Sequence, residues 1–155
     1  MTDALATLAM VRDTRRTLAA VADALPDAAR TTIPDGFNNH VLWNVGHVVA
    51  TERALTYTLS GLPTGLPDGF MQAFRKGSSP RDWDRAWDYA EVRDLLVSLP
   101  DQTEADLRAG RFEQYRAYTT SAGVTVTSVH DAIRFNLYHE GLHLGSVLAL
   151  RRLVG

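Results

Sequence analysis

The segment from Ser128 to the C-terminal end constrains the fold more strongly than any other part of the sequence. Thr127 or Ser128 can cap a helix here, with His130 or Asp131 at its third position. After Tyr138 the apolar residues lie on nearly every side of this helix: Leu142, Leu144, Val147, Leu148, Leu150 and Leu153. A helix that is apolar on all sides is normally buried among other elements. We therefore expect a central, buried helix at this end of the chain.

Two helices are predicted in the first part of the chain. Residues 3–25 carry apolar side chains at helical spacing, and this helix stops before Pro26. Asn38 or Asn39 can cap a second helix that runs to about Ser60. The stretch between the two helices contains prolines and a glycine, which favours a loop.

A long loop and a third helix follow. The loop over residues 61–81 is rich in Gly and Pro, and the helix begins between residues 82 and 89. Pro100 either ends or kinks this helix, with more helix over residues 103–109. Residues 111–126 can form a short extended arm but not a sheet. We expect the 61–81 loop and the 111–126 arm to form any substrate pocket.

Four helices and one long crossover loop predict an all-α fold, an antiparallel four-helix bundle in which residues 1–155 form a single domain. A chain of 155 residues can bury a sizeable core. The sequence has no cysteine, which excludes disulfides and thiolate ligands from the chain itself. It shows neither a signal-peptide pattern nor a membrane-spanning apolar stretch, so we expect a cytoplasmic protein.

The charge pattern argues against nucleic acid as a partner. The net charge is −2, whereas a dedicated nucleic-acid binder normally has a basic stripe. The densest basic groups are Arg12, Arg15 and Arg16, then Arg75 and Lys76, then Arg151 and Arg152. Each group is small, and we expect these residues on solvated helix faces or near helix C-termini. The expected partner is a small-molecule substrate, with no nucleic acid and no membrane.

The five residues His139-Glu140-Gly141-Leu142-His143 place two histidines four positions apart in the last predicted helix. Imidazoles at this spacing lie on one helix face and can bind the same ion, as they do in zinc enzymes. No His, Asp, Glu or Cys follows His143. Any third ligand must therefore come from an earlier part of the chain.

Polar side chains recur along one face of the last helix and along one face of the second. The two stripes consist of Asn136, His139 and His143, and of His40, Asn44, His47 and Thr51. Buried polar groups cost free energy unless they find partners, and both helices are otherwise largely apolar. We therefore expect the stripes to face each other, with an ion between them satisfying several groups at once.

The sequence thus predicts a divalent metal ion bound by His47, His139 and His143. Three neutral imidazoles leave at least one coordination position open, which is typical of a catalytic site. Water in that position would become a nucleophile, or a substrate oxygen or thiol could replace it. His40 is the alternative third ligand, whereas His130 points to the opposite side of its helix. Zinc and nickel are the expected metals, with iron as an alternative.

Four other residues on these helices are candidates for assisting the site. Glu140 is expected to act as a general base toward bound water or to orient a ligand, and the alternative is an exposed glutamate. Glu52, Asn136 and Asn44 could orient the ligand imidazoles, and ordinary packing is the alternative role.

These residues lie in segments that resemble the DinB/YfiT-like superfamily. Residues 39–47, Asn-His-Val-Leu-Trp-Asn-Val-Gly-His, followed by Glu52, are similar to the second helix of that family. Residues 138–145, Tyr-His-Glu-Gly-Leu-His-Leu-Gly, and the closing Leu-Arg-Arg-Leu at 150–153 are similar to its last helix. The resemblance covers essentially the whole chain, including the loop at 74–80.

The resemblance implies a four-helix bundle, usually a homodimer, with a divalent metal on three histidines. The corresponding residues in this sequence are His47, His139 and His143. Members of the family include S-transferases and isomerases that use low-molecular-weight thiols such as mycothiol or bacillithiol, and metal-dependent hydrolases. We therefore expect a metal-dependent S-transferase, isomerase or hydrolase, with such a thiol as a candidate cosubstrate.

Two other functional classes remain as alternatives. The sequence His-Glu-x-x-His is also the signature of zinc proteases, but those enzymes take their third ligand downstream and align a peptide on a sheet edge. Neither feature is available in this sequence. The other alternative is a non-catalytic metal-binding or stress-related module, in which the protein itself would fill the fourth coordination position.

Overall fold

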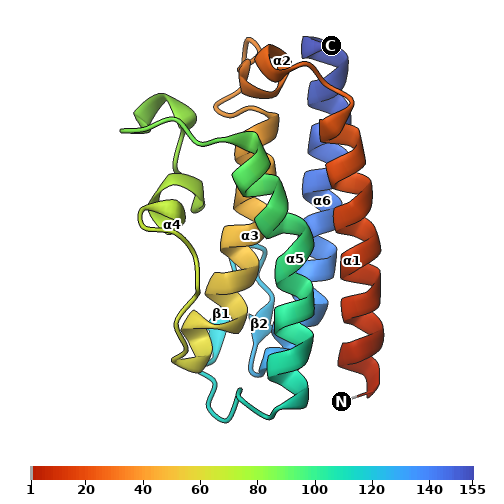
Figure 1. Ribbon diagram of the computed structural model, residues 1–155. Coiled ribbons are helices and arrows are strands. Elements are labelled where there is room, and N and C mark those ends of the chain that lie inside the picture. Colours follow the sequence, from red (N-terminus) through yellow and green to blue (C-terminus); the bar gives the residue numbers. More distant parts are fainter. Residues whose placement is uncertain (1) are drawn as a thin grey trace.

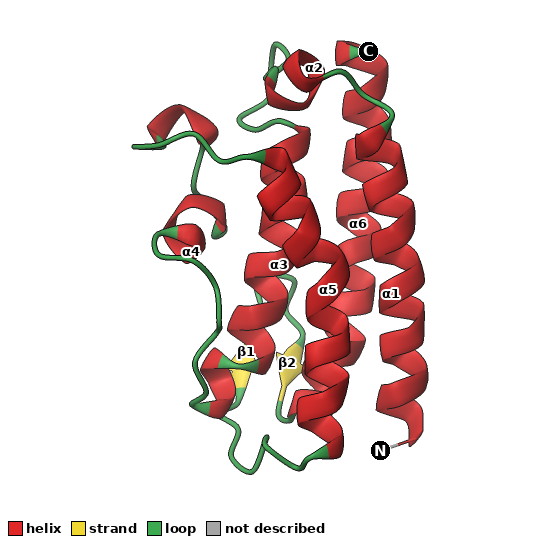
Figure 2. Cartoon of the chain, viewed as in Figure 1, coloured by secondary structure: helices red, strands yellow, loops and turns green. Residues whose placement is uncertain are grey.

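The computed structural model describes residues 2–155 (Figure 1). Its long helices are α1 (Thr2–Asp23), α3 (Val41–Thr56), α5 (Tyr89–Arg108) and α6 (Val129–Val154). The shorter elements are α2 (Asp27–Thr31), 3₁₀ turns at Thr58–Ser60 and Pro80–Asp82, α4 (Phe70–Phe74), and strands β1 (Tyr118–Thr119) and β2 (Thr125–Val126). The strands pair antiparallel in one small hairpin within the predicted extended arm (Figure 2). The prediction that this arm forms no sheet is wrong, because the hairpin is a two-stranded sheet. The expected all-α class is confirmed.

The long helices pack side by side, with α1 and α3 each in contact with both α5 and α6. In Figure 1, α1 and α6 run in one direction, whereas α3 and α5 run in the other. The expected antiparallel arrangement therefore applies to α3 with α6 and to α1 with α5, but not to α1 with α6 or α3 with α5. The reason is the crossover, residues 57–88, which carries the chain back along the molecule between α3 and α5 (Figure 1).

The helices that carry the two polar stripes begin at polar caps. The Nδ1 atom of His40 accepts a hydrogen bond from the Trp43 backbone amide at 3.0 Å, and this caps α3. The prediction of a cap at Asn38 or Asn39 is wrong, because His40 takes that position. Ser128 caps α6, as one of the two predicted alternatives required.

The crossover contains α4, a helix that the sequence pattern does not predict. Phe70 and Phe74 of α4 are fully buried in the core that they share with α3. A Cβ atom at Gly46 of α3 would overlap the ring of Phe74. A glycine at this position therefore lets the crossover lie directly on α3, next to His47. The 26–37 loop likewise contains a short helix, α2.

Pro100 lies inside α5, which continues without a break to Arg108, so the helix predicted over residues 103–109 is part of α5 and ends one residue earlier. Proline has no backbone N–H, so the carbonyl of Leu96, four residues earlier, lacks its helical donor. The buried guanidinium of Arg15 in α1 replaces that donor, giving a hydrogen bond from Nη1 to the Leu96 oxygen at 3.1 Å. A neighbouring helix thus compensates for the proline, and α5 does not end there.

The last helix is only partly buried, so the expectation of a central helix is wrong. Val147 and Leu150 are buried, but Leu142 and Leu153 are 52% and 59% exposed. The exposed large apolar residues of α6, which we call its outer apolar face, are Tyr138, Leu142, Leu148 and Leu153. The apolar side chains of α6 therefore lie on two faces: one packs against the other helices, and the other is the outer apolar face. Among residues 2–155, no helix has both the length and the apolar character needed to cross a membrane.

Candidate metal centre

The structure brings His47 of α3 together with His139 and His143 of α6. Each ring offers one nitrogen, and these atoms all lie within 4.8 Å of one another. The ring centroids are 5.1 Å apart for His47 and His139, 4.7 Å for His47 and His143, and 4.5 Å for His139 and His143. His40 lies outside this histidine cluster because its ring caps α3.

The ring of His47 is held in one orientation by its neighbours. Its Nδ1 lies 2.7 Å from the carbonyl oxygen of Phe74, which can only accept, so this nitrogen carries the proton and donates. The imidazole also stacks on Trp43, with ring centroids 4.6 Å apart and an angle of 9° between the planes. The Nε2 atom is consequently unprotonated, and it accepts a hydrogen bond from the hydroxyl of Thr51 at 3.3 Å.

Asn44 orients the ring of His143. The side-chain nitrogen of Asn44 donates to the His40 carbonyl at 2.9 Å and to the side-chain oxygen of Asn39 at 3.0 Å, which fixes the direction of the amide. Its oxygen therefore faces the Nδ1 of His143 at 2.8 Å and accepts a hydrogen bond from it. The Nε2 of His143 retains its lone pair, as a metal ligand requires.

His139 and Asn136 have no such partners. The ring of His139 lies against Phe135, but its buried Nδ1 has no hydrogen-bond partner among residues 2–155. Both side-chain polar atoms of Asn136 are also buried and unpaired within that range. The structure therefore does not support the expectation that Asn136 orients a ligand ring.

Burial keeps the cluster neutral. Desolvation lowers the pKa of His139 to about 3 and that of His143 to about 4, because the charged form loses its hydration. Desolvation also lowers the pKa of His47, with a smaller contribution from the positive charge of Lys76. The imidazoles are therefore unprotonated at neutral pH, which is the form that binds metals.

The sequence was compared with models of known protein families. A family model of the DinB superfamily matches residues 10–147, a range that contains all three histidines of the cluster. The chain belongs to the DinB superfamily. No curated protein gives a significant match to the sequence.

In this DinB-superfamily chain Glu140 does not join the histidines. It is completely buried, and its Oε1 and Oε2 accept hydrogen bonds from the Arg15 guanidinium at 2.8 and 3.2 Å. Both oxygens are thus engaged in an ion pair between α6 and α1. This placement contradicts an exposed glutamate and does not support a general base, because neither oxygen is free to take a proton from a bound water.

Glu52 also lies away from the histidines. Its Oε1 accepts hydrogen bonds from the hydroxyls of Thr56 at 3.1 Å and Thr103 at 2.9 Å, and its Oε2 lies 3.2 Å from the Nε of Arg53. These contacts tie α3 to α5. Glu52 therefore does not orient a ligand, and of the predicted orienting residues only Asn44 contacts a ring of the cluster.

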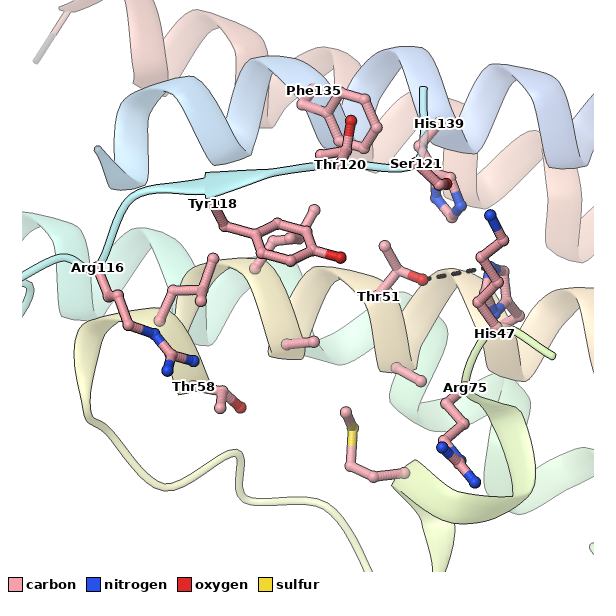
Figure 3. A pocket seen from close by; sticks show the side chains of 16 residues that line it. His47, Thr51, Thr58, Arg75, Arg116, Tyr118, Thr120, Ser121, Phe135 and His139 are labelled. Carbon is pink, nitrogen blue, oxygen red and sulfur yellow. Dashed lines mark hydrogen bonds between the residues drawn. The ribbon is translucent and has the colours of Figure 1, made fainter. Parts of the chain in front are cut away.

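A pocket of about 320 Å³ opens beside the cluster (Figure 3). The residues that line it are His47, Ala50, Thr51, Ala54, Leu55, Thr58, Leu59, Met71, Arg75, Lys76, Arg116, Tyr118, Thr120, Ser121, Phe135 and His139. They come from α3, α6, the crossover and the hairpin region. The prediction that the 61–81 loop and the 111–126 arm supply pocket walls is confirmed.

The individual residues that those two segments contribute could not be identified from the sequence. Arg75 and Lys76 were expected on a solvated face, and Arg116 and Tyr118 had no predicted role. The available signal was the presence of charged and aromatic side chains in loops expected to cover the site. It was too weak to distinguish these residues from their neighbours.

Proposed function

We propose that His47, His139 and His143 hold one divalent metal ion. The observation that carries this proposal is the commitment of two Nδ1 hydrogens to oxygen acceptors, which leaves an Nε2 lone pair on His47 and on His143. The ring of His139 adds a nitrogen close to both. A set of three neutral imidazoles fits zinc or nickel, with iron as the third candidate.

We propose that this chain is a metal-dependent enzyme, either a thiol-dependent S-transferase or isomerase or a hydrolase. When bound, the ion would supply a Lewis acid that acidifies a water or a thiol. His47 and His139 line the pocket, so a small molecule can reach the cluster from that side. Thr51 and Tyr118 present hydroxyls on the same pocket and can hydrogen-bond a substrate there (Figure 3).

Metal content tests the ligand set directly. His47→Ala, His139→Ala and His143→Ala should each abolish stoichiometric zinc in the purified protein, measured by elemental analysis. His130→Ala is the matched control, because His130 lies on α6 outside the cluster, and it should retain full zinc. Full occupancy in any one of the three cluster variants would remove that residue from the site.

A cobalt-substituted protein tests the thiol reaction. Saturation with mycothiol or bacillithiol should change the visible spectrum of the cobalt ion if the thiol enters its coordination sphere. A thiol-transfer screen with both thiols then measures turnover. No spectral change with either thiol would count against the S-transferase branch and favour hydrolysis or no catalysis.

A non-catalytic metal-binding module is the second candidate, and one observation favours it. Among the described residues that line the pocket there is no carboxylate to serve as a general base. A crystal structure of the zinc-loaded protein distinguishes the two candidates. A protein atom in the fourth coordination position would favour the module, whereas an open position facing the pocket would favour the enzyme.

We also propose that the long helices form the four-helix bundle of the DinB-like proteins and that two copies associate through the outer apolar face of α6. Exposure of four large apolar side chains on one helix supports an interface there. Light scattering during size exclusion should give the mass of a dimer. Leu142→Glu should give a monomer, and an unchanged mass would place any interface elsewhere.

A further inference from the structure

The pocket beside the histidine cluster is lined by three cations and no anion. Arg75, Lys76 and Arg116 contribute to its walls. None of these side chains forms an ion pair with any other residue between 2 and 155, although Arg12, Arg15, Arg53, Arg93 and Arg111 do. Positive charge therefore accumulates at the pocket without internal compensation.

The cations lie at two places. Figure 3 shows Arg75 on the side of the pocket near His47, and Arg116 at the other end, beyond Tyr118. Lys76 follows Arg75 and is close enough to His47 for its charge to act on that ring. The apolar part of the lining consists of Ala50, Ala54, Leu55, Leu59, Met71 and Phe135.

The backbone around Arg116 is anchored to α3 and the turn after it. The amide of Arg116 donates to the Leu59 carbonyl at 2.7 Å, and the hydroxyl of Tyr115 donates to the Leu55 carbonyl at 2.9 Å. The guanidinium itself has no hydrogen-bond partner in the described chain. The fold thus fixes the backbone of Arg116 at this end of the pocket, while the donors of its exposed guanidinium remain available to a ligand.

We propose that the pocket binds a small organic carboxylate with an apolar body, whose carboxylate pairs with Arg116 at the end remote from the histidines. A guanidinium matches the planar geometry of a carboxylate with two parallel hydrogen bonds. The apolar lining covers the body of the ligand, and the pocket volume suits a small molecule. The assignment of the other end of the ligand to reaction at the histidines rests on the proposed function, whereas the role of Arg116 does not.

Two matched probes test this assignment: 4-phenylbutyrate and its neutral counterpart 4-phenylbutanamide. Titrations of the metal-free and the zinc-loaded protein, followed by amide NMR shifts, give a Kd for each probe. The wild-type protein should bind the carboxylate more tightly in both forms. Arg116→Gln should weaken carboxylate binding about fivefold, as expected for one exposed charge-assisted contact, and change amide binding by less than about twofold.

Arg151→Gln is the control, since it removes the same charge from an exposed position in the last turn of α6. It should leave both Kd values unchanged. Equal Kd values for the two probes, or a carboxylate preference that persists in Arg116→Gln, would overturn the proposal. A preference seen only in the zinc-loaded protein would also overturn it, because the metal would then be the carboxylate site.

These outcomes separate the two proposals. If the protein binds no zinc but the metal-free form still loses its carboxylate preference in Arg116→Gln, the metal centre fails and the carboxylate site stands. If zinc binds to the three histidines and neither probe is distinguished, the metal centre stands and the carboxylate site fails.

Discussion

His139 and Glu140 are adjacent in α6, yet they lie in opposite kinds of polar environment. Glu140 faces α1, where Arg15 neutralises it and where the same guanidinium also serves the free carbonyl of Leu96. His139 faces α3 and the pocket, and its Nδ1 has no partner in the described chain. Glu140 thus completes a hydrogen-bond network, whereas His139 keeps ring nitrogens that a ligand can use.

One helix, α6, thus carries a stabilising ion pair on one face and the candidate metal ligands on another. In the buried ion pair every nitrogen of the Arg15 guanidinium donates a hydrogen bond, and the pair joins α1, α5 and α6. In the histidine cluster, Phe74 and Asn44 hold the Nδ1 atoms of His47 and His143, so the Nε2 atoms of these two rings are left unprotonated. Substitutions at the ion pair should therefore reduce stability most, and substitutions behind the histidines should reduce metal affinity.

Glu140→Ala should have the largest effect, because it leaves the buried charge of Arg15 without a partner. We expect the free energy of unfolding to fall by about 3–5 kcal/mol, measured by urea denaturation of the metal-free protein. Asp13→Ala is the control, since the Asp13–Arg16 pair is exposed and should contribute less than about 1 kcal/mol. Equal losses in the two variants would show that the buried pair of Glu140 and Arg15 contributes no more stability than an exposed pair.

Gly46→Ala should displace the crossover from α3, because its methyl group overlaps the Phe74 ring. We expect a loss of about 1–3 kcal/mol in the free energy of unfolding. Zinc affinity should fall as well, since the Phe74 carbonyl that orients His47 moves with the ring. Gly145→Ala, an open position on α6, is the matched control. Unchanged zinc affinity in Gly46→Ala would mean that the Phe74 contact does not position His47.

Asn44→Ala should weaken zinc binding about 10–100-fold, the range typical for loss of a residue that orients a ligand. Competition with a chelator measures the affinity. Asn136→Ala provides a comparison on the other stripe, and it should change the affinity much less because Asn136 bonds to no ring of the cluster. A larger loss in Asn136→Ala than in Asn44→Ala would reverse the assignment.

Acidification should destabilise the metal-free protein moderately. The pKa values of His40 and His143 are about 4 and that of His139 is about 3 in the folded state, against an ordinary value of 6.5. The unfolded chain therefore binds more protons below pH 6.5, so stability is complete above that pH and declines toward pH 4. We expect a lower Tm at pH 5 than at pH 7, and a smaller difference in the double variant His139→Ala with His143→Ala. An equal pH dependence in both proteins would contradict these shifts.

The helices and the candidate cluster could be predicted largely from the sequence. Periodicity located the long helices, and the spacing of His139 and His143 together with the stripe containing His47 identified residues that the fold brings together. These signals are local or repeat along one helix face. The sequence pattern alone is therefore enough to locate the long helices and the three candidate ligands.

The remaining features depend on contacts between distant residues. From the sequence, Arg15 is expected to be a surface charge. In the structure it is buried, because it donates to the Leu96 carbonyl that Pro100 leaves without a donor and pairs with Glu140. Glu140 reads as a catalytic residue because its motif places it between two histidines, although its direction from the helix axis sends it to α1. The exposure of Leu142 and Leu153 depends on how many neighbours α6 has. The sequence pattern does not show that number.

The crossover over residues 57–88 has a consequence for how such a protein can diversify. It supplies the carbonyl that holds His47, and it also supplies Arg75 and Lys76 at the pocket wall. Helices α1 and α6, with the ion pair between Arg15 and Glu140, lie outside this segment. Substitutions at Arg75 and Lys76 can therefore change the charge of the pocket wall while Phe70, Phe74 and Trp87 keep the crossover packed on the helices that carry the histidines.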